Sequence, residues 1–235
     1  MEKRLQGLAA RAAAVLLLIT PSLACADDPA PSPKVLAALK VVFDAMDAAA
    51  RDDAALPPPK SDSERLIRLG VLDQAGRVQI FKIPWASLSP AEGLAARKAL
   101  AAKMDPIDRD DLAQVVSMIP PDGWFSYSRY GRAAADAAFD IVQHGDSQTQ
   151  RRVLPMIEAF AEHGEADPDN FAKMYDRLAI ETGPQRFGTQ FHCVNGFTAP
   201  YPVVDPAAVE TRRTALGLKP SFAEMSAGVA HIACR

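Results

Sequence analysis

The sequence predicts a mainly α-helical protein, a single helical domain with a β-hairpin near its C-terminus. Apolar residues recur at helical spacing through most of the chain, and the composition is rich in alanine, the best helix former. One stretch instead shows strand-like alternation, from Phe187 to Cys193, and Asn195-Gly196 follows it. Because Asn-Gly accepts the positive φ values of a two-residue hairpin turn, we expect a hairpin over residues 185–202.

The first 26 residues have the pattern of a secretory signal peptide. A positively charged start precedes an apolar run over residues 12–19, and Ala24 and Ala26 occupy the small-residue positions of a cleavage site. The apolar run is too short to span a bilayer. We expect export to the periplasm of a bacterium and a mature chain that begins at Asp27.

The three cysteines leave two questions open. Leu23-Ala24-Cys25 resembles a lipobox, so a lipoprotein anchored through Cys25 is the alternative to a released protein. In an oxidising compartment Cys193 and Cys234 would form a disulfide that ties the C-terminal tail to the body, and two separately buried thiols are the alternative. The sequence has no Cys-x-x-Cys and no paired Cys/His spacing, so no zinc site of the familiar kind is predicted.

The chain after the signal peptide divides into a linker and a domain. Residues 27–33 are a polar, proline-rich linker, and residues 34–235 form the domain. Ser32 and Pro33 open the first helix, whose apolar stripe consists of Val35, Leu39, Val42 and Met46. Residues 52–62 are expected to form a loop, residues 64–69 a short helix and residues 71–83 a hairpin around Ala75-Gly76.

Further helices are expected over residues 89–103, 108–119, 132–144, 147–162, 167–183 and 205–216. Capping boxes start two of them, at Ser89 with Glu92 and at Ser147 with Gln150. Gly145 ends the helix that carries His144.

Composition and missing motifs exclude several classes of protein. The chain has 235 residues, of which 49% are hydrophobic and 23% charged, and these values are typical of globular proteins rather than disordered ones. Its net charge of -3 gives no support to nucleic-acid binding. The sequence contains no P-loop, no dinucleotide-binding fingerprint and no Gly-x-Ser-x-Gly elbow.

Short polar motifs stand out in the second half of the chain. They are Gln143-His144-Gly145-Asp146 with Gln150, Asp176-Arg177, Gln185-Arg186-Phe187-Gly188-Thr189-Gln190, and Arg212-Arg213 with Gly217-Leu218. On these motifs, residues 104–225 resemble a bacterial family described only as a domain of unknown function, and Met46-Asp47 with Arg51 look like its upstream element. Gly145 and Phe187 depart from the pattern, where alanine and tyrosine are expected. The resemblance implies a common fold and a shared polar site, but no reaction.

His144 is the strongest candidate for acid–base chemistry, because imidazole titrates near neutral pH. A histidine at the end of a helix equally complements the helix dipole. Asp146 and Gln150 lie at the same helix–helix corner, where they either share a site with His144 or cap the following helix.

Arg186, Gln190 and His192 fall on one face of the predicted strand. Gly188 leaves a gap in that face, which either a ligand or a neighbouring side chain fills. The guanidinium of Arg177 suits an anionic group, and a structural ion pair is its alternative role.

The sequence therefore supports two hypotheses about function. In the first, an exported module binds a small anionic ligand or a protein partner through Asp146, Gln150, Arg177, Arg186, Gln190 and His192. In the second, a hydrolase or transferase uses His144 as the catalytic general acid/base, and arginines stabilise negative charge. We prefer the first because no nucleophile or metal cluster is evident. No cofactor, metal, nucleic acid or membrane span is expected in either.

Overall fold

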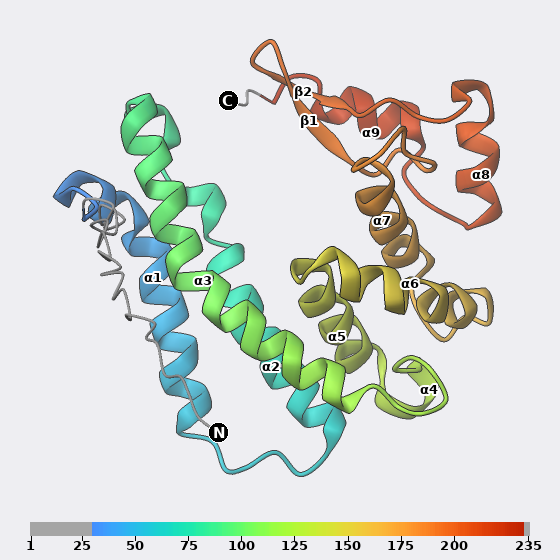
Figure 1. The fold of residues 1–235 in the computed structure, drawn as a ribbon, viewed down its shortest axis with the longest axis horizontal. Coiled ribbons are helices and arrows are strands. Elements are labelled where there is room, and N and C mark those ends of the chain that lie inside the picture. Colours follow the sequence, from blue (N-terminus) through green and yellow to red (C-terminus); the bar gives the residue numbers. More distant parts are fainter. Residues whose placement is uncertain (1–29, 233–235) are drawn as a thin grey trace, which may run out of the picture. The chain divides into compact units, whose positions relative to one another are not determined.

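A computed structural model of the protein describes residues 30–232 (Figure 1). These residues form nine α-helices and one antiparallel hairpin, so the predicted fold class is confirmed. Residues from Pro31 onward make one compact unit. The predicted signal peptide, residues 27–29 of the predicted linker, Cys25 and Cys234 lie outside the described residues. Within residues 30–232 no helix has the length and apolar character needed to cross a membrane.

The helices follow one another with short connections. Their bounds are α1 (Pro33–Ala54), α2 (Asp62–Arg77), α3 (Pro90–Met118), α4 (Tyr127–Tyr130), α5 (Arg132–His144), α6 (Ser147–Glu162), α7 (Pro168–Ala179), α8 (Val209–Ala215) and α9 (Phe222–Val229). The strands are β1 (Phe191–Val194) and β2 (Phe197–Pro200). Three short 3-10 helices lie at Ile80–Lys82, Trp85–Ser87 and Pro206–Ala208.

The first three helices pack side by side, α1 and α3 enclosing one hydrophobic cluster (Figure 1). The side chain of Ser32 accepts the N–H of Val35, and Pro33 is the first residue of α1, as the sequence predicts. The predicted stripe of α1 is buried and packs against α3. It consists of Val35, Leu39, Val42 and Met46.

The predicted hairpin over residues 71–83 is wrong, because this segment continues as helix α2 to Arg77. Leu66, Leu69 and Asp73 are buried at helical spacing along α2. Gly76, which suggested a turn, allows a close approach of α1 instead. A Cβ on Gly76 would lie 2.7 Å from Cγ of Met46.

The predicted break between residues 103 and 108 is also wrong. The helix α3 is continuous, with Pro106 on its exposed side. Its first half contributes Ala96 and Leu100 to the cluster with α1, while Val115 belongs to a second cluster. Proline removes one hydrogen bond from the helix, but both halves of α3 are anchored by buried side chains, and the helix continues through Pro106.

The second hydrophobic cluster joins α2 and the end of α3 to helices α4–α7, around Trp124 and Phe125. The bounds of α5 and α6 are the predicted ones. The cap of α6 is Asp146, which accepts the N–H of Thr149, and not the predicted Ser147. The crossing of α2 and α5 is close, since a Cβ on Gly70 would lie 2.5 Å from Cβ of Ala137.

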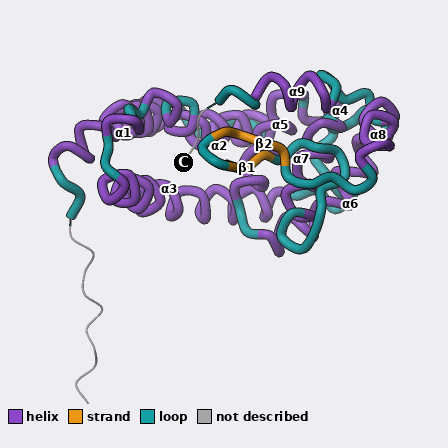
Figure 2. The backbone as a smooth tube through the Cα atoms, turned by 90° about the horizontal axis from the view of Figure 1, so that it is seen from above, coloured by secondary structure: helices purple, strands orange, loops and turns teal. Residues whose placement is uncertain are grey.

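The C-terminal part carries the hairpin, drawn in orange in Figure 2. Its turn is the predicted one, with φ of 51° at Asn195 and 86° at Gly196. The strands are shorter than predicted, because residues 185–190 form a loop. The predicted helix over 205–216 is a 3-10 turn followed by α8. The sequence analysis missed α9, although Ser221 and Glu224 form its capping box.

Candidate functional site

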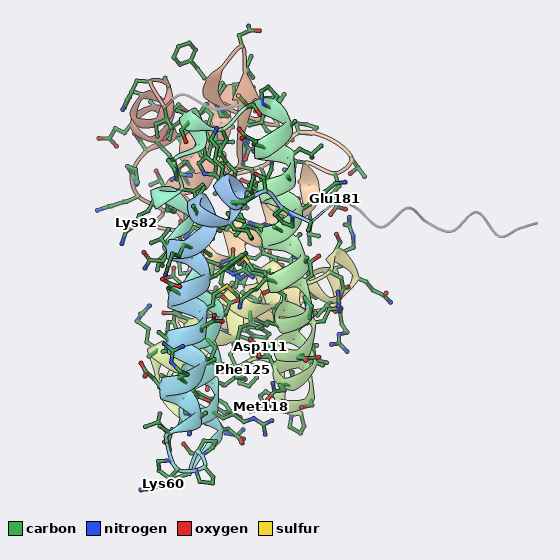
Figure 3. All side chains as sticks on the ribbon, turned by 90° about the vertical axis from the view of Figure 1, so that its left-hand side faces the viewer. Lys60, Lys82, Asp111, Met118, Phe125 and Glu181 are labelled. Atoms are coloured by element: carbon green, nitrogen blue, oxygen red, sulfur yellow. The ribbon has the colours of Figure 1, made fainter. Side chains whose placement is uncertain are left out.

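A polar cluster lies where α2, α3 and α5 meet. We define it by Asp73 and Arg77 of α2, Asp108 and Asp111 of α3, and His144 at the end of α5. On α2 it begins where the buried leucines of the second hydrophobic cluster end. Figure 3 labels Asp111 on the part of α3 that faces the α1–α2 pair.

The centre of the cluster is the carboxylate of Asp73, whose side chain is 1% exposed. Nδ1 of His144 lies 3.1 Å from each of its two oxygens. Nε of Arg77 donates to Asp73 at 3.2 Å, and Nη2 of Arg77 donates to Asp108 at 2.6 Å. The amide of Gln74 donates a further bond to Asp73 at 2.7 Å. These contacts supply the partners that a buried charge requires.

The contact with Asp73 orients the imidazole of His144. A carboxylate beside Nδ1 favours the proton on that nitrogen, which leaves Nε2 as the second functional atom of the ring. The His144 side chain is 17% exposed. Among residues 30–232 we find no hydrogen-bond partner for Nε2. His144 is therefore held at Nδ1, while Nε2 makes no hydrogen bond within the described residues.

Asp111 is a buried carboxyl group whose surroundings oppose its ionisation. Its residue is 5% exposed, and Oδ2 has no hydrogen-bond partner within the described part of the chain. Burial, followed by the negative charges of Asp73, Asp108 and Asp110, raises the pKa of Asp111 to about 6, against the attraction of Arg77. Burial also raises the pKa of the nearby Asp140.

Arg177 of α7 contacts the C-terminal end of α5, next to His144. Its Nη1 donates to the backbone carbonyl of Gln143 at 3.0 Å. Burial, and then the positive charge of Arg77, lower the pKa of Arg177. In the described part of the chain no carboxylate forms an ion pair with it. The guanidinium is thus half-buried, close to a second arginine and lacking a negative partner.

The structure brings four of the predicted site residues, His144, Asp146, Gln150 and Arg177, to one corner. The amide of Gln150 is buried and donates to the carbonyls of Gln143 and Gly145, each at 3.0 Å. The backbone carbonyl of Gln143, next to His144, thus accepts hydrogen bonds from both Gln150 and Arg177. Asp146 caps α6 at the same corner through two bonds from Thr149, at 2.8 and 2.9 Å.

The Asp176-Arg177 motif has two different roles. The buried carboxylate of Asp176 accepts the backbone N–H groups of Arg186, Phe187 and Thr189 at 2.7, 3.0 and 2.9 Å, and the hydroxyl of Thr189 at 3.0 Å. It therefore fixes the loop over residues 185–190, whereas Arg177 points to the corner of His144.

The loop residues that we expected on one strand face are not arranged in that way. Arg186 lies over the rings of Tyr175 and Phe187, with its guanidinium carbon 5.6 and 5.2 Å from the ring centres. Gln190 donates to the carbonyl of Lys173 at 3.2 Å, and His192 stacks on Tyr201. The shared-face expectation is wrong because the chain is not extended before Phe191. The contacts found for these residues within the described chain do not include the polar cluster.

Neighbouring side chains account for both unusual glycines. A Cβ on Gly188 would lie 2.3 Å from the ring of Phe222, so Phe222 fills the gap that we considered for a ligand. A Cβ on Gly145 would lie 2.7 Å from Cδ2 of Leu112. Glycine at this position lets Leu112 pack against the corner that holds His144.

The sequence analysis missed four members of the polar cluster, namely Asp73, Arg77, Asp108 and Asp111. The hairpin interpretation of residues 71–83 concealed Asp73 and Arg77, which lie one turn apart on a helix. An available signal was an aspartate on the buried face that Leu66, Leu69 and Gly76 define. Among residues 30–232, no group of three histidine, cysteine or acidic side chains is arranged to hold a metal.

A comparison with protein-family models identifies the family of the chain. The model described as a family of unknown function (DUF6624) matches residues 60–226. The chain belongs to this family. The DUF6624 region includes the whole polar cluster and Arg177, and it begins after Met46-Asp47 and Arg51. Searches of curated proteins and of solved structures found no match for the chain.

Asp111→Asn tests the electrostatics of the cluster. Folding raises the pKa of Asp111 from an ordinary value of 3.8 to about 6, so ionisation of this carboxyl group lowers the free energy of unfolding. The loss is complete above pH 6 and absent below about pH 4. We expect the variant to exceed the wild type in free energy of unfolding by up to about 3 kcal/mol at pH 8, with the difference vanishing near pH 4.

Urea denaturation between pH 4 and pH 8 measures this difference. Asp110→Asn, at the exposed neighbouring position of α3, is the matched control. Its difference in free energy of unfolding from the wild type should depend much less on pH. A loss of stability in Asp111→Asn that is equal at every pH would contradict the assignment.

Proposed function

We propose that the protein is an exported binding protein whose polar cluster accepts a small anionic group, contacted by Arg177 and His144. The observation that carries the proposal is the half-buried Arg177. Its charge lies near that of Arg77, and no carboxylate of the described chain pairs with it. An anion bound there would offset both the lost hydration of the guanidinium and the repulsion between the two arginines.

The geometry of Arg177 favours an oxyanion. The bond from Nη1 to Gln143 fixes the guanidinium and leaves its other N–H groups for a ligand. A planar guanidinium matches the oxygens of phosphate, sulfate or carboxylate in a forked arrangement. His144, oriented by Asp73, supplies a further donor at Nε2 when the ring is protonated.

The carboxyl groups of the cluster make binding dependent on pH. Asp111 carries a negative charge above its pKa of about 6 and is neutral below it. Because a negative charge in the cluster repels an anionic ligand, affinity should rise as the pH falls through 6.

Inorganic phosphate is the probe that tests this proposal. We expect phosphate to bind in a calorimetric titration at pH 6, and Arg177→Gln to weaken its binding at least tenfold. Glutamine retains a donor for the Gln143 carbonyl, so the corner can stay folded. Arg152→Gln, at an exposed position of α6, is the matched control and should bind like the wild type. Equal affinity in the Arg177 and Arg152 variants would exclude Arg177 as a contact.

The contact between His144 and Asp73 favours a second candidate, a hydrolase or transferase. A buried carboxylate that orients an imidazole is the arrangement by which histidine acts as general acid and base. Arg177 would then hold negative charge that develops in the transition state.

Turnover of chromogenic esters separates the two candidates. For an enzyme we expect hydrolysis of 4-nitrophenyl phosphate or acetate that falls at least 100-fold in His144→Gln. Asp73→Asn should lower kcat more than it changes KM, because Asp73 orients the ring without touching a substrate. Phosphate binding without any turnover supports the binding protein instead.

Export rests on the pattern of residues 1–26, with cleavage before Asp27, and a lipid anchor at Cys25 is the alternative. A disulfide between Cys193 and Cys234 belongs to the same proposal. It is supported by the hairpin, where the N–H and hydroxyl of Thr198 donate to the carbonyl of Ile232 at 2.9 and 3.0 Å and bring the tail beside β2.

The intact mass of protein recovered from a periplasmic fraction tests these assignments together. We expect a chain that begins at Asp27 and gains two hydrogens on reduction. A retained Met1 would contradict export by cleavage, and a lipid on Cys25 would replace the released form by the anchored one.

A further inference from the structure

A pocket lies between α2, α3 and the end of α1 with the segment that follows it. Its volume is about 290 Å³. Its lining includes Asp53, Arg65, Arg68, Leu69, Leu72 and Gln114. None of these residues belongs to the polar cluster, although Leu72 precedes Asp73 on α2. The pocket is therefore a separate candidate site within the same helix pair.

One of the two arginines in the pocket is fully engaged by the protein. Nε of Arg68 donates to the carboxylate of Asp53 at 2.6 Å, and Nη2 donates to the carbonyl of the same residue at 3.0 Å. Nη1 of Arg68 donates to the carbonyl of Pro57 at 2.6 Å. Asp53 thus balances the charge of Arg68 and fixes one wall of the pocket.

The other arginine leaves the pocket with a positive charge. Nη2 of Arg65 donates to Oε1 of Gln114 at 2.8 Å. In the described part of the chain no carboxylate pairs with Arg65. That bond uses one N–H group of Arg65 and the oxygen of Gln114, and it leaves the other N–H groups of Arg65 and the amide N–H groups of Gln114 as donors for a ligand.

The rest of the lining is apolar. Leu69 is buried and Leu72 is half-buried, and both contribute hydrocarbon surface beside Arg65 on α2. A ligand that fits must therefore combine an acceptor for N–H groups at one end with an apolar body at the other. Inorganic phosphate lacks the apolar body, which distinguishes this pocket from the polar cluster.

We propose that this pocket binds a small amphipathic carboxylic acid. Its carboxylate contacts Arg65 and Gln114, and its hydrocarbon part covers Leu69 and Leu72. The volume is close to the lower limit of about 300 Å³ for ligand sites, which favours a short-chain acid over a long-chain one. This inference does not depend on the proposed function of the polar cluster.

Sodium hexanoate is the probe, and amide chemical shifts of the isotopically labelled mature protein are the measurement. We expect saturable shifts at Leu69, Leu72 and Gln114 at neutral pH. Hexanol, which has the same chain without the charge, should bind at least tenfold more weakly. Arg65→Gln should weaken hexanoate binding to a similar extent, and Arg109→Gln, at an exposed position of α3, should not change it.

Several results would overturn the proposal. They are the absence of saturable shifts in the pocket, equal binding of hexanol, and unchanged binding in Arg65→Gln. Displacement of hexanoate by an equal concentration of inorganic phosphate would overturn the role of the apolar lining. Because Arg65 is exposed, we expect Arg65→Gln to fold. Amide chemical shifts outside the pocket that match those of the wild type verify this.

Discussion

A carboxylate that is almost completely buried, that of Asp73, lies where α2, α3 and α5 meet. A charge in this position is tolerated only when donors surround it, and Arg77 and His144 provide them from two helices. Arg77 extends the contact to α3 through Asp108. The need to satisfy one buried charge therefore sets how α2, α3 and α5 meet, and it leaves a histidine with one nitrogen fixed and the other available.

A second buried carboxylate, that of Asp176, holds a loop in place in the C-terminal half. Asp176 binds three backbone N–H groups of the loop over residues 185–190, and Arg213 donates to the carbonyl of Phe187 in the same loop. The Gln-x-x-Gly-Thr-Gln motif forms this loop. Arg177 directly follows Asp176 on α7, so neighbouring positions of one helix contact two different parts of the chain: Asp176 the loop and Arg177 the carbonyl of Gln143.

Much of the fold, and less of the site, could be predicted from the sequence. Local signals were sufficient for the caps of α1 and α3, the bounds of α5 and α6, and the Asn195-Gly196 turn. They failed at Gly76, whose meaning depends on Met46 of another helix, and at Pro106, which lies on an exposed face. His144 and Arg177 were chosen from their chemistry. Asp73 was missed because its segment was not recognised as a helix. Asp111 lies in a predicted helix, but its burial depends on how α3 packs against other helices, which local sequence does not show.

We infer that the cluster around Asp73 binds an anion and is not a closed network of ion pairs. A crystal structure of residues 27–235 grown with inorganic phosphate is the decisive test. We expect a phosphate ion bound to the guanidinium of Arg177, within hydrogen-bonding distance of Nε2 of His144. Arg177 paired with a carboxylate of its own chain, and no phosphate in the cluster, would contradict it.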